Sequence, residues 1–238
     1  MIKHLKICSV APLVLLAACS TNKYVTKPED PLEPLNRGVY KFNKTLDALY
    51  IKPTSKIYEK ILPLALRKLI SNFFNNLNEI PTIANSLLQA KYQQVAESTA
   101  RFTINSTLGV GGLFDVATKA NIKRSKEDFG KTLAVWGYKN SNYLVLPIIG
   151  PSTVRDGLGF CGNAFMGVPY YLKPKWRNRY ELAYSVNLRT ELQEVELLIS
   201  KAGVDEYSLV RDAYLQHREY TISDQSNTNG KMLSEPPE

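Results

Sequence analysis

The chain has 238 residues, a formal net charge of +8, and 44% hydrophobic residues. That length suits one domain with a large core, and no segment after Cys19 reaches the roughly eighteen unbroken apolar residues of a membrane-spanning helix. Of the three cysteines, Cys8 lies in the N-terminal leader and Cys19 directly follows its predicted end, which leaves Cys161 as the one cysteine further along the chain and excludes a disulfide framework.

The N-terminus has the pattern of a lipoprotein signal peptide. Lys3 and Lys6 precede the apolar run Ile7–Leu16, and Leu16-Ala-Ala-Cys19 closes the run with small residues. The run is too short to span a membrane and ends in a cleavage pattern. The sequence therefore predicts that residues 1–18 are removed and that Cys19 becomes the lipidated first residue.

The residue after the lipidation site indicates the compartment. Aspartate at this place is the usual retention signal for the inner membrane, and Ser20 stands there instead. We therefore expect a lipid-anchored protein on the periplasmic side of the outer membrane, held by more than one acyl chain. The mature part keeps 28 basic and 22 acidic residues, and its net charge of +6 suits anionic head groups. This location excludes nucleic acid as a partner.

The first part of the mature chain predicts a tether and then a helix. Residues 19–29 are mostly polar, whereas Asp30 and Glu33 flank Pro31 in a pattern typical of a capped helix start. An apolar stripe follows at helical spacing and predicts one buried helix face, which Pro53 ends. The stripe consists of Leu32, Leu35, Val39, Phe42, Leu46 and Leu49.

The chain stays helical up to a cluster of glycines. A short helical piece leads to Pro63, and Leu64–Leu77 has a wide apolar face beside two basic residues. This face fits either the core of a helical bundle or a membrane interface. Another helix starts at Pro81, and Tyr92–Leu108 forms the next.

The sequence Arg101–Asp115 contains the corner around which we interpret the chain. Gly109, Gly111 and Gly112 end the helix, and Leu113 and Phe114 resume apolar packing at once, which predicts a tight buried corner that can pivot. The cluster lacks the Lys-Ser/Thr of a P-loop and the strand-to-helix spacing of a dinucleotide site.

The remainder of the chain is also predicted to be mainly helical. Tyr143–Gly150 is the one segment with the pattern of a strand, and Ser152 is placed to cap the helix that follows. Long helical patterns cover Lys175–Lys201 and Asp205–Tyr220. Residues 223–238 have little to bury, so we expect a disordered tail. The predicted fold class is all-α.

The residues needed for catalysis are missing. Once the signal peptide is removed, His217 is the only histidine, and Ser152 lacks the G-x-S-x-G turn of a nucleophilic serine. One histidine and one thiol cannot build a His/Cys metal cluster. We therefore expect no enzyme activity, metal or cofactor.

Six ordered motifs resemble the MlaA (VacJ) lipoprotein family, together with the lipidation pattern. Two departures from the family pattern are Pro34 and Ala90, each where the family usually has glycine. The motifs are D-P-L-E-P-L-N-R-G-V-Y-K-F-N, S-N-F-F-N-N-L-N-E-I-P, N-S-L-L-Q-A-K, R-F-T-I-N-S-T-L-G-V-G-G-L-F-D-V-A, E-D-F-G-K-T-L-A-V-W-G and Y-L-V-L-P-I-I-G-P-S-T-V-R-D.

The resemblance implies a ring-like helical domain over residues 30–222, seated in the inner leaflet of the outer membrane beside trimeric porins. It also implies an amphipathic channel through which misplaced phospholipids leave the outer leaflet for a periplasmic lipid carrier of the Mla type. The alternatives are an envelope lipoprotein that only scaffolds other proteins, and a lipid hydrolase that would depend on Ser152.

On this resemblance we form two hypotheses about the site. The first is that Leu108, Gly109, Gly111, Gly112, Leu113 and Phe114 form or adjoin the channel wall, with the glycines as a hinge. The second is that Arg101 or Arg155 contacts the lipid head group. The competing interpretation is that these arginines pair with Asp115 and Asp156 and hold the ring together.

Overall fold

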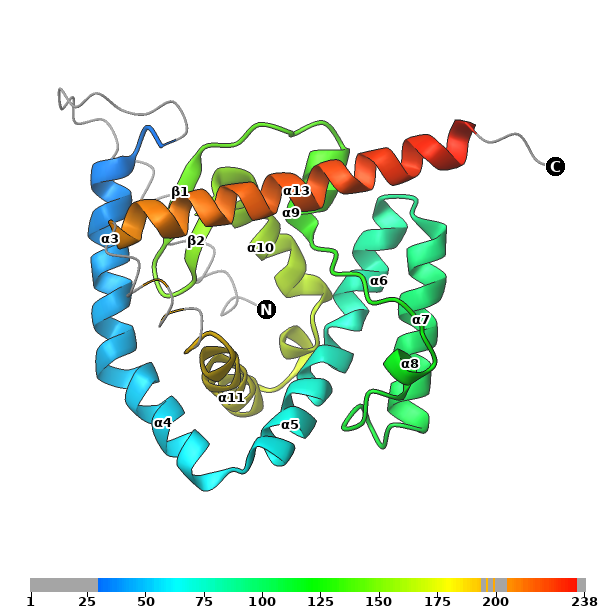
Figure 1. Cartoon of the computed structure of the whole chain (residues 1–238), viewed down its shortest axis with the longest axis horizontal. Helices are drawn as coiled ribbons and strands as arrows, with labels where there is room; N and C mark the ends of the chain where they lie inside the picture. Colours follow the sequence, from blue (N-terminus) through cyan, green and yellow to red (C-terminus); the bar gives the residue numbers. More distant parts are fainter. Residues whose placement is uncertain (1–29, 194–195, 197–198, 200–204, 235–238) are drawn as a thin grey trace.

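The computed structural model describes residues 30–193, 196, 199 and 205–234. The predicted signal peptide, Cys19 and the tether therefore lie outside the described residues. Figure 1 shows a ring of helices with one small two-stranded sheet, which confirms the predicted helical, ring-like fold.

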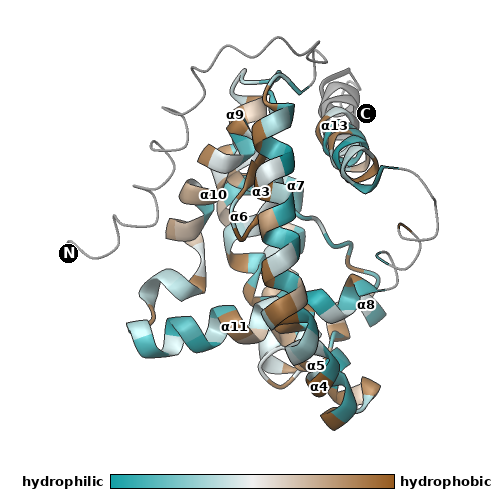
Figure 2. Ribbon diagram, turned by 90° about the vertical axis from the view of Figure 1, so that its left-hand side faces the viewer, coloured by the Kyte–Doolittle hydropathy of each residue, from teal (hydrophilic) through white to brown (hydrophobic). Residues whose placement is uncertain are grey.

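The elements follow one another around this ring. An arc of α3, α4 and α5 faces α6 and α7 on the opposite side, and α13 crosses one face from α3 toward α9 (Figure 1). Figure 2 shows the ring from the side, with α11 extending away from the face opposite α13. In chain order the helices are α3 (Glu33–Leu46), the π-helix η2 (Asp47–Ile51), α4 (Lys52–Ile61), α5 (Leu64–Leu77), α6 (Glu79–Leu88), α7 (Tyr92–Thr107), α8 (Val116–Lys119), α9 (Phe129–Val135), α10 (Val154–Met166), the 3-10 helix η3 (Val168–Tyr171), α11 (Pro174–Glu191) and α13 (Glu206–Ser234), and the strands β1 (Tyr143–Leu146) and β2 (Gly150–Thr153) lie between α9 and α10.

The sequence predicts that the first helix ends at Pro53, but in the structure the helix continues past this residue. The chain passes from α3 through η2 into α4, and the Lys52 N–H donates to the Asp47 carbonyl in the wider π pattern. Pro53 is the second residue of α4 and follows this π turn directly, and the helical backbone continues past it. Pro63 does break the chain, because Leu62 is extended before α5 begins.

The predicted cap at Asp30 is also wrong. Leu32 precedes α3 without a capping side chain, and Asp30 is buried instead. Asp30 accepts hydrogen bonds from Asn36 Nδ2 at 2.8 Å and from the Tyr207 hydroxyl at 2.5 Å. The carboxylate therefore joins the start of α3 to α13 rather than satisfying the N-H groups of its own helix.

The predicted strand is one half of an antiparallel hairpin. Tyr143 pairs with Thr153 and Leu146 with Gly150, so the chain returns along β2 before α10 begins. Ser152 lies in β2, and the helix cap is the next residue, Thr153, whose side chain accepts the Asp156 N–H. The predicted cap, Ser152, is therefore wrong by one residue, because β2 continues past Pro151 to Thr153.

Two asparagines on α3 fasten this hairpin to the ring. Asn36 donates to the Tyr143 carbonyl at 3.2 Å and accepts the Val145 N–H at 2.9 Å. One heptad later, Asn43 donates to the Leu146 carbonyl at 2.8 Å and accepts the N–H of residue 148 at 2.7 Å. Their side chains therefore extend the hydrogen-bonding pattern of the sheet onto the helix.

The last helix is longer than the sequence predicted. α13 runs from Glu206 to Ser234, whereas a disordered tail was expected from residue 223. Once a helix has formed, each further residue adds a hydrogen bond at little cost, so a helix can extend beyond the part that packs on the domain. At the other end of α13, Tyr207 joins Tyr143 and Val145 in the apolar core.

Candidate functional site

The glycine corner is a compact turn at the end of α7. The N–H groups of Gly109 and Gly112 donate to Ile104 and Asn105 carbonyls at 3.1 and 2.7 Å. A Cβ on Gly109 would lie 2.2 Å from the Phe114 carbonyl oxygen, and one on Gly112 would lie 2.6 Å from the Asn76 side chain. Close packing therefore requires glycine at both positions, and Gly112 also has a positive φ of 91°.

The apolar side chains of the corner are not buried, contrary to the sequence prediction. Leu108 is 71% exposed, and Val110 and Phe114 are exposed as well. Gly111 has a positive φ of 67° and no atom within 4 Å of an added Cβ. The corner thus combines tightly packed glycines with an open apolar surface at the end of α7.

Arg101 lies in a buried cluster rather than on a surface open to a ligand. Its Nε donates to Glu79 at 3.1 Å, and its Nη2 donates to both oxygens of Asp115 at 3.0 and 3.1 Å. Its Nη1 donates to the Thr118 hydroxyl and to the Ile122 carbonyl. Five contacts match the five N–H donors of a guanidinium, and the side chain is only 3% exposed.

The structure therefore shows the pairing of Arg101 with Asp115 that was the competing interpretation. Glu79 is buried as well, and burial raises the pKa of its carboxyl group. The hydrogen bond from Arg101 and the nearby charge of Arg124 act in the opposite direction but are smaller effects. A head group could reach Arg101 only by displacing protein acceptors. The cluster joins α6, α7 and the N-terminus of α8, where Asp115 caps the helix.

Arg155 is likewise held inside the protein. Its Nε donates to Asp156 at 3.0 Å and its Nη1 donates to the Lys139 carbonyl at 2.9 Å. The predicted pair with Asp156 therefore exists. The side chain is also buried, so the guanidinium does not face solvent. Arg155 thus fixes the start of α10 to the loop before β1.

Arg218, which the sequence analysis missed, connects α13 to two other helices. It donates two hydrogen bonds of 2.6 Å to Asp128, the N-cap of α9, and bonds of 2.8 and 2.9 Å to Asp156 on α10. Burial opposes ionisation of Asp156, but the hydrogen bond and charge of Arg218, helped by Arg155, lower the pKa of Asp156 to about 2. The Tyr214 hydroxyl also donates to Asp156 at 2.8 Å.

An open cleft lies beside this ion cluster. Its volume is about 230 Å³, and its wall combines apolar groups from the hairpin and α10 with the charged groups of the cluster. A wall of this kind suits a molecule that has both apolar and polar parts. The lining residues are Asp128, Leu146, Ile149, Pro151, Ser152, Asp156, Phe160, Asn163, Tyr214 and Arg218.

The arc of α3, η2, α4 and α5 exposes a set of large apolar side chains that we call the apolar arc. Leu49 is 63% exposed, and Figure 2 shows hydrophobic residues recurring along these helices. Part of the apolar face of α5 is buried, because Phe74 packs edge-on against Tyr180 and Tyr184 of α11, and the remainder is exposed. The apolar arc consists of Phe42, Leu49, Tyr50, Ile57, Ile61, Leu64, Leu66 and Phe73.

The interior shows the opposite preference. Among the buried residues in the described ranges, polar and charged ones outnumber hydrophobic ones. Gln89 Nε2, for example, donates to both Glu127 and Thr132, and Thr132 in turn donates to Asn85. A water-soluble domain normally has the reverse arrangement. This distribution is the one expected of a protein whose exposed surface meets an apolar medium.

A catalytic or metal site does not emerge from the described part of the chain. The Ser152 hydroxyl is buried in β2 and donates to the carbonyl of the adjacent Thr153. In residues 30–193 and 205–234 no group of three or more His, Cys, Asp or Glu could hold a metal ion. Nor does any described helix combine the length and apolar character needed to cross a membrane.

Comparisons with known proteins agree on one family. A family model described as MlaA lipoprotein matches residues 28–221. The intermembrane phospholipid transport system lipoprotein MlaA of Escherichia coli is 32% identical over 216 residues, which cover 87% of this chain and 85% of that protein. An uncharacterized protein of Rickettsia bellii is 33% identical over 195 residues, 81% of this chain and 76% of that one.

A solved structure is similar to the whole ring. It comes from work on the structural basis for maintenance of bacterial outer membrane lipid asymmetry, and it superposes with a TM-score of 0.70 at 30% sequence identity. The similarity covers 81% of this chain and 98% of that chain. The shared architecture therefore includes almost all of the solved protein.

Proposed function

The chain belongs to the MlaA lipoprotein family, and from that premise we propose that it removes misplaced phospholipids from the outer leaflet of the outer membrane. In this proposal the lipids pass through an amphipathic channel in the ring to a periplasmic carrier of the Mla type. A trimeric porin holds the ring in place, and acyl chains on Cys19 anchor it from the periplasmic side.

The observation that carries the proposal is the reversed distribution of apolar and polar side chains. The apolar arc gives the ring an exposed surface suited to lipid tails, although none of the described helices can cross a bilayer. A ring that lies within one leaflet meets both conditions, because its helices then run along the membrane rather than through it.

The cleft and the glycine corner support the second half of the proposal. Moving a lipid between membranes breaks no covalent bond, so it needs a sheltered path for apolar tails and polar contacts for the head group. The cleft beside Arg218 has both kinds of wall, and the glycine corner offers an apolar surface next to Gly111. We keep the hypothesis that Leu108–Phe114 adjoins the path and that Gly111 gives it play.

The transport function is tested in a Gram-negative cell that lacks its own MlaA-family lipoprotein. The full chain is expected to lower the amount of phospholipid in the outer leaflet, and Cys19→Ala is expected not to do so. Leu49→Asp should also fail, because a carboxylate on the apolar arc costs several kcal/mol in a bilayer. The matched control Lys139→Asp changes an exposed residue outside the arc and should behave like the parent chain.

The alternative of a scaffold without transport activity predicts a different result. Purified full-length protein is reconstituted with a trimeric porin in vesicles that carry labelled phospholipid, and transfer to a soluble carrier is followed. A scaffold would assemble with the porin and leave the lipid in place. Gly111→Val tests the pivot in the same assay, and unchanged transfer at normal abundance would remove the hinge from the mechanism.

A further inference from the structure

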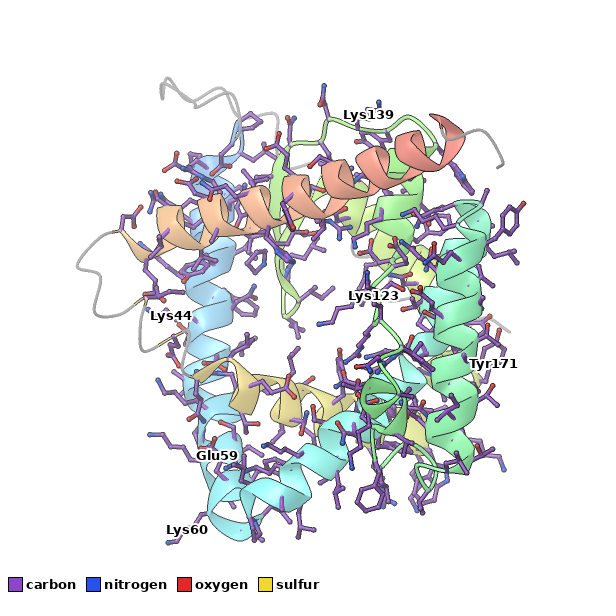
Figure 3. All side chains as sticks on the ribbon, turned by 45° about the vertical axis from the view of Figure 1, so that its right-hand side comes forward. Lys44, Glu59, Lys60, Lys123, Lys139 and Tyr171 are labelled. Atoms are coloured by element: carbon purple, nitrogen blue, oxygen red, sulfur yellow. The ribbon has the colours of Figure 1, made fainter. Side chains whose placement is uncertain are left out.

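The loop between α8 and α9 presents a cation toward the centre of the ring. Figure 3 shows Lys123 on the inner side of this loop, extending toward the space that the helices and the hairpin surround. Lys60 and Lys139, which the same figure labels, lie at the outer edge. Lys123 is exposed, so its ammonium can meet a molecule in that space.

The backbone on either side of Lys123 is held in place, whereas its side chain is exposed. The preceding residue, Ile122, donates its N–H to the Ala117 carbonyl at 3.1 Å and accepts the 2.7 Å bond from buried Arg101. The following residue, Arg124, has its Nε 3.7 Å from Glu79. Both neighbours are thus tied to the Arg101 cluster, which holds the loop in one position.

The charge of Lys123 has no protein partner within the described ranges. Its ammonium makes no hydrogen bond or ion pair there, whereas Lys44 and Lys52 pair with Glu206 and Glu196. A cation that extends inward without a carboxylate attracts an anion, and the attraction is stronger where protein and lipid exclude water. A lysine ammonium is a common ligand for phosphate oxygens.

We propose that Lys123 binds the phosphate of the phospholipid head group inside the ring and that its charge favours anionic over zwitterionic phospholipids. This inference rests on the proposed transport function. Lys123 takes the role that the sequence analysis gave to Arg101 and Arg155, whose donors are used within the protein. A zwitterionic head group carries its own ammonium, which weakens its attraction to a second cation, whereas phosphatidylglycerol keeps its full negative charge.

The test uses full-length protein reconstituted with a trimeric porin in vesicles of phosphatidylethanolamine and phosphatidylglycerol, each labelled in turn. The variants are Lys123→Gln, Lys123→Glu and Lys123→Arg, with Lys139→Gln as the matched control on the outer edge. Lys123→Gln should slow transfer of phosphatidylglycerol about fivefold relative to phosphatidylethanolamine, the effect of one charged contact partly open to water. Lys123→Glu should slow it further, and Lys123→Arg should keep the preference.

The outcomes separate the inference from the transport function. If the parent chain moves neither lipid, the proposed function fails. If the parent chain moves both and the ratio of the two rates is the same in Lys123→Glu, the head-group role of Lys123 is overturned. Excess inorganic phosphate should slow transfer by the parent chain, because it competes for the same ammonium, and equal slowing of Lys123→Gln would count against binding at Lys123. Circular dichroism verifies that each variant is folded.

Discussion

Replacing Arg218 with methionine tests whether α13 is held on the ring by its ion cluster. The methionine keeps most of the side-chain volume but leaves Asp128 and Asp156 without the cation that binds both. Removing one partner of a largely buried ion pair costs about 3 kcal/mol or more, because the remaining charges stay buried. For a domain of this size that corresponds to a fall in Tm of roughly 6–12 °C.

The pH dependence provides a second and independent measure. Since the folded-state pKa of Asp156 is about 2, against 3.8 for the free side chain, ionised Asp156 contributes about 2 kcal/mol of stability above about pH 4. That contribution is lost as the pH falls toward about 2. In Arg218→Met the pKa of Asp156 moves back up, so acidification removes less stability than it does in the parent chain.

The assay is thermal unfolding of the detergent-solubilised protein, followed by circular dichroism at about pH 7 and about pH 2. Lys44→Met is the control, because Lys44 pairs with Glu206 at the other end of α13 but is 54% exposed. Such a pair contributes at most about 1 kcal/mol. If Arg218→Met has the same Tm as Lys44→Met and the same response to acid as the parent, the reasoning about the cluster is wrong.

Two further substitutions test how the ring is assembled. Asn36→Ala removes three buried hydrogen bonds that join α3 to β1 and to the start of the chain, and we expect a loss of about 3 kcal/mol, measured as a lower Tm. Gly112→Ala forces a Cβ to within 2.6 Å of Asn76 at a φ of 91°, so it should cost clearly more than Gly111→Ala, where about 1 kcal/mol reflects φ alone. Equal losses from the two alanine variants would show that packing against Asn76 is unimportant.

Features that depend on local chemistry could be predicted from the sequence. The helical spacing of the apolar residues predicts α3, α5 and α7, and Pro63 marks a real break. The glycine cluster predicts the end of α7 close to its observed place. In each case the signal is the backbone preference of the residues themselves, which tertiary contacts do not reverse.

Features that depend on distant partners could not be predicted. Asp30 has the pattern of a helix cap, but Asn36 and Tyr207 bind it, and Tyr207 lies 177 residues further along the chain. Pro53 has the pattern of a helix end, but the π-helical turn before it allows the helix to continue. Sequence spacing carries no information about such rearrangements.

The candidate site also contains residues that the sequence predicts and residues that it does not. The pairing partners Asp115 and Asp156 were identified beforehand because they lie close to Arg101 and Arg155 in sequence or in motif. Arg218 was missed because nothing near it in the sequence indicates that it binds two carboxylates on other helices. One signal could have pointed to the hairpin contact: Asn36 and Asn43 lie seven residues apart on α3, close to its apolar stripe.

The joining of α13 to α3 also determines when this protein can reach its final shape. Tyr207 binds Asp30 and Arg37 binds Asp205, so the two ends of the domain meet only after almost the whole polypeptide exists. Closing so long a loop costs conformational entropy, so we expect this contact to form late in folding. Until it happens, the partly folded molecule exposes the helices of the apolar arc without the contacts that close the ring.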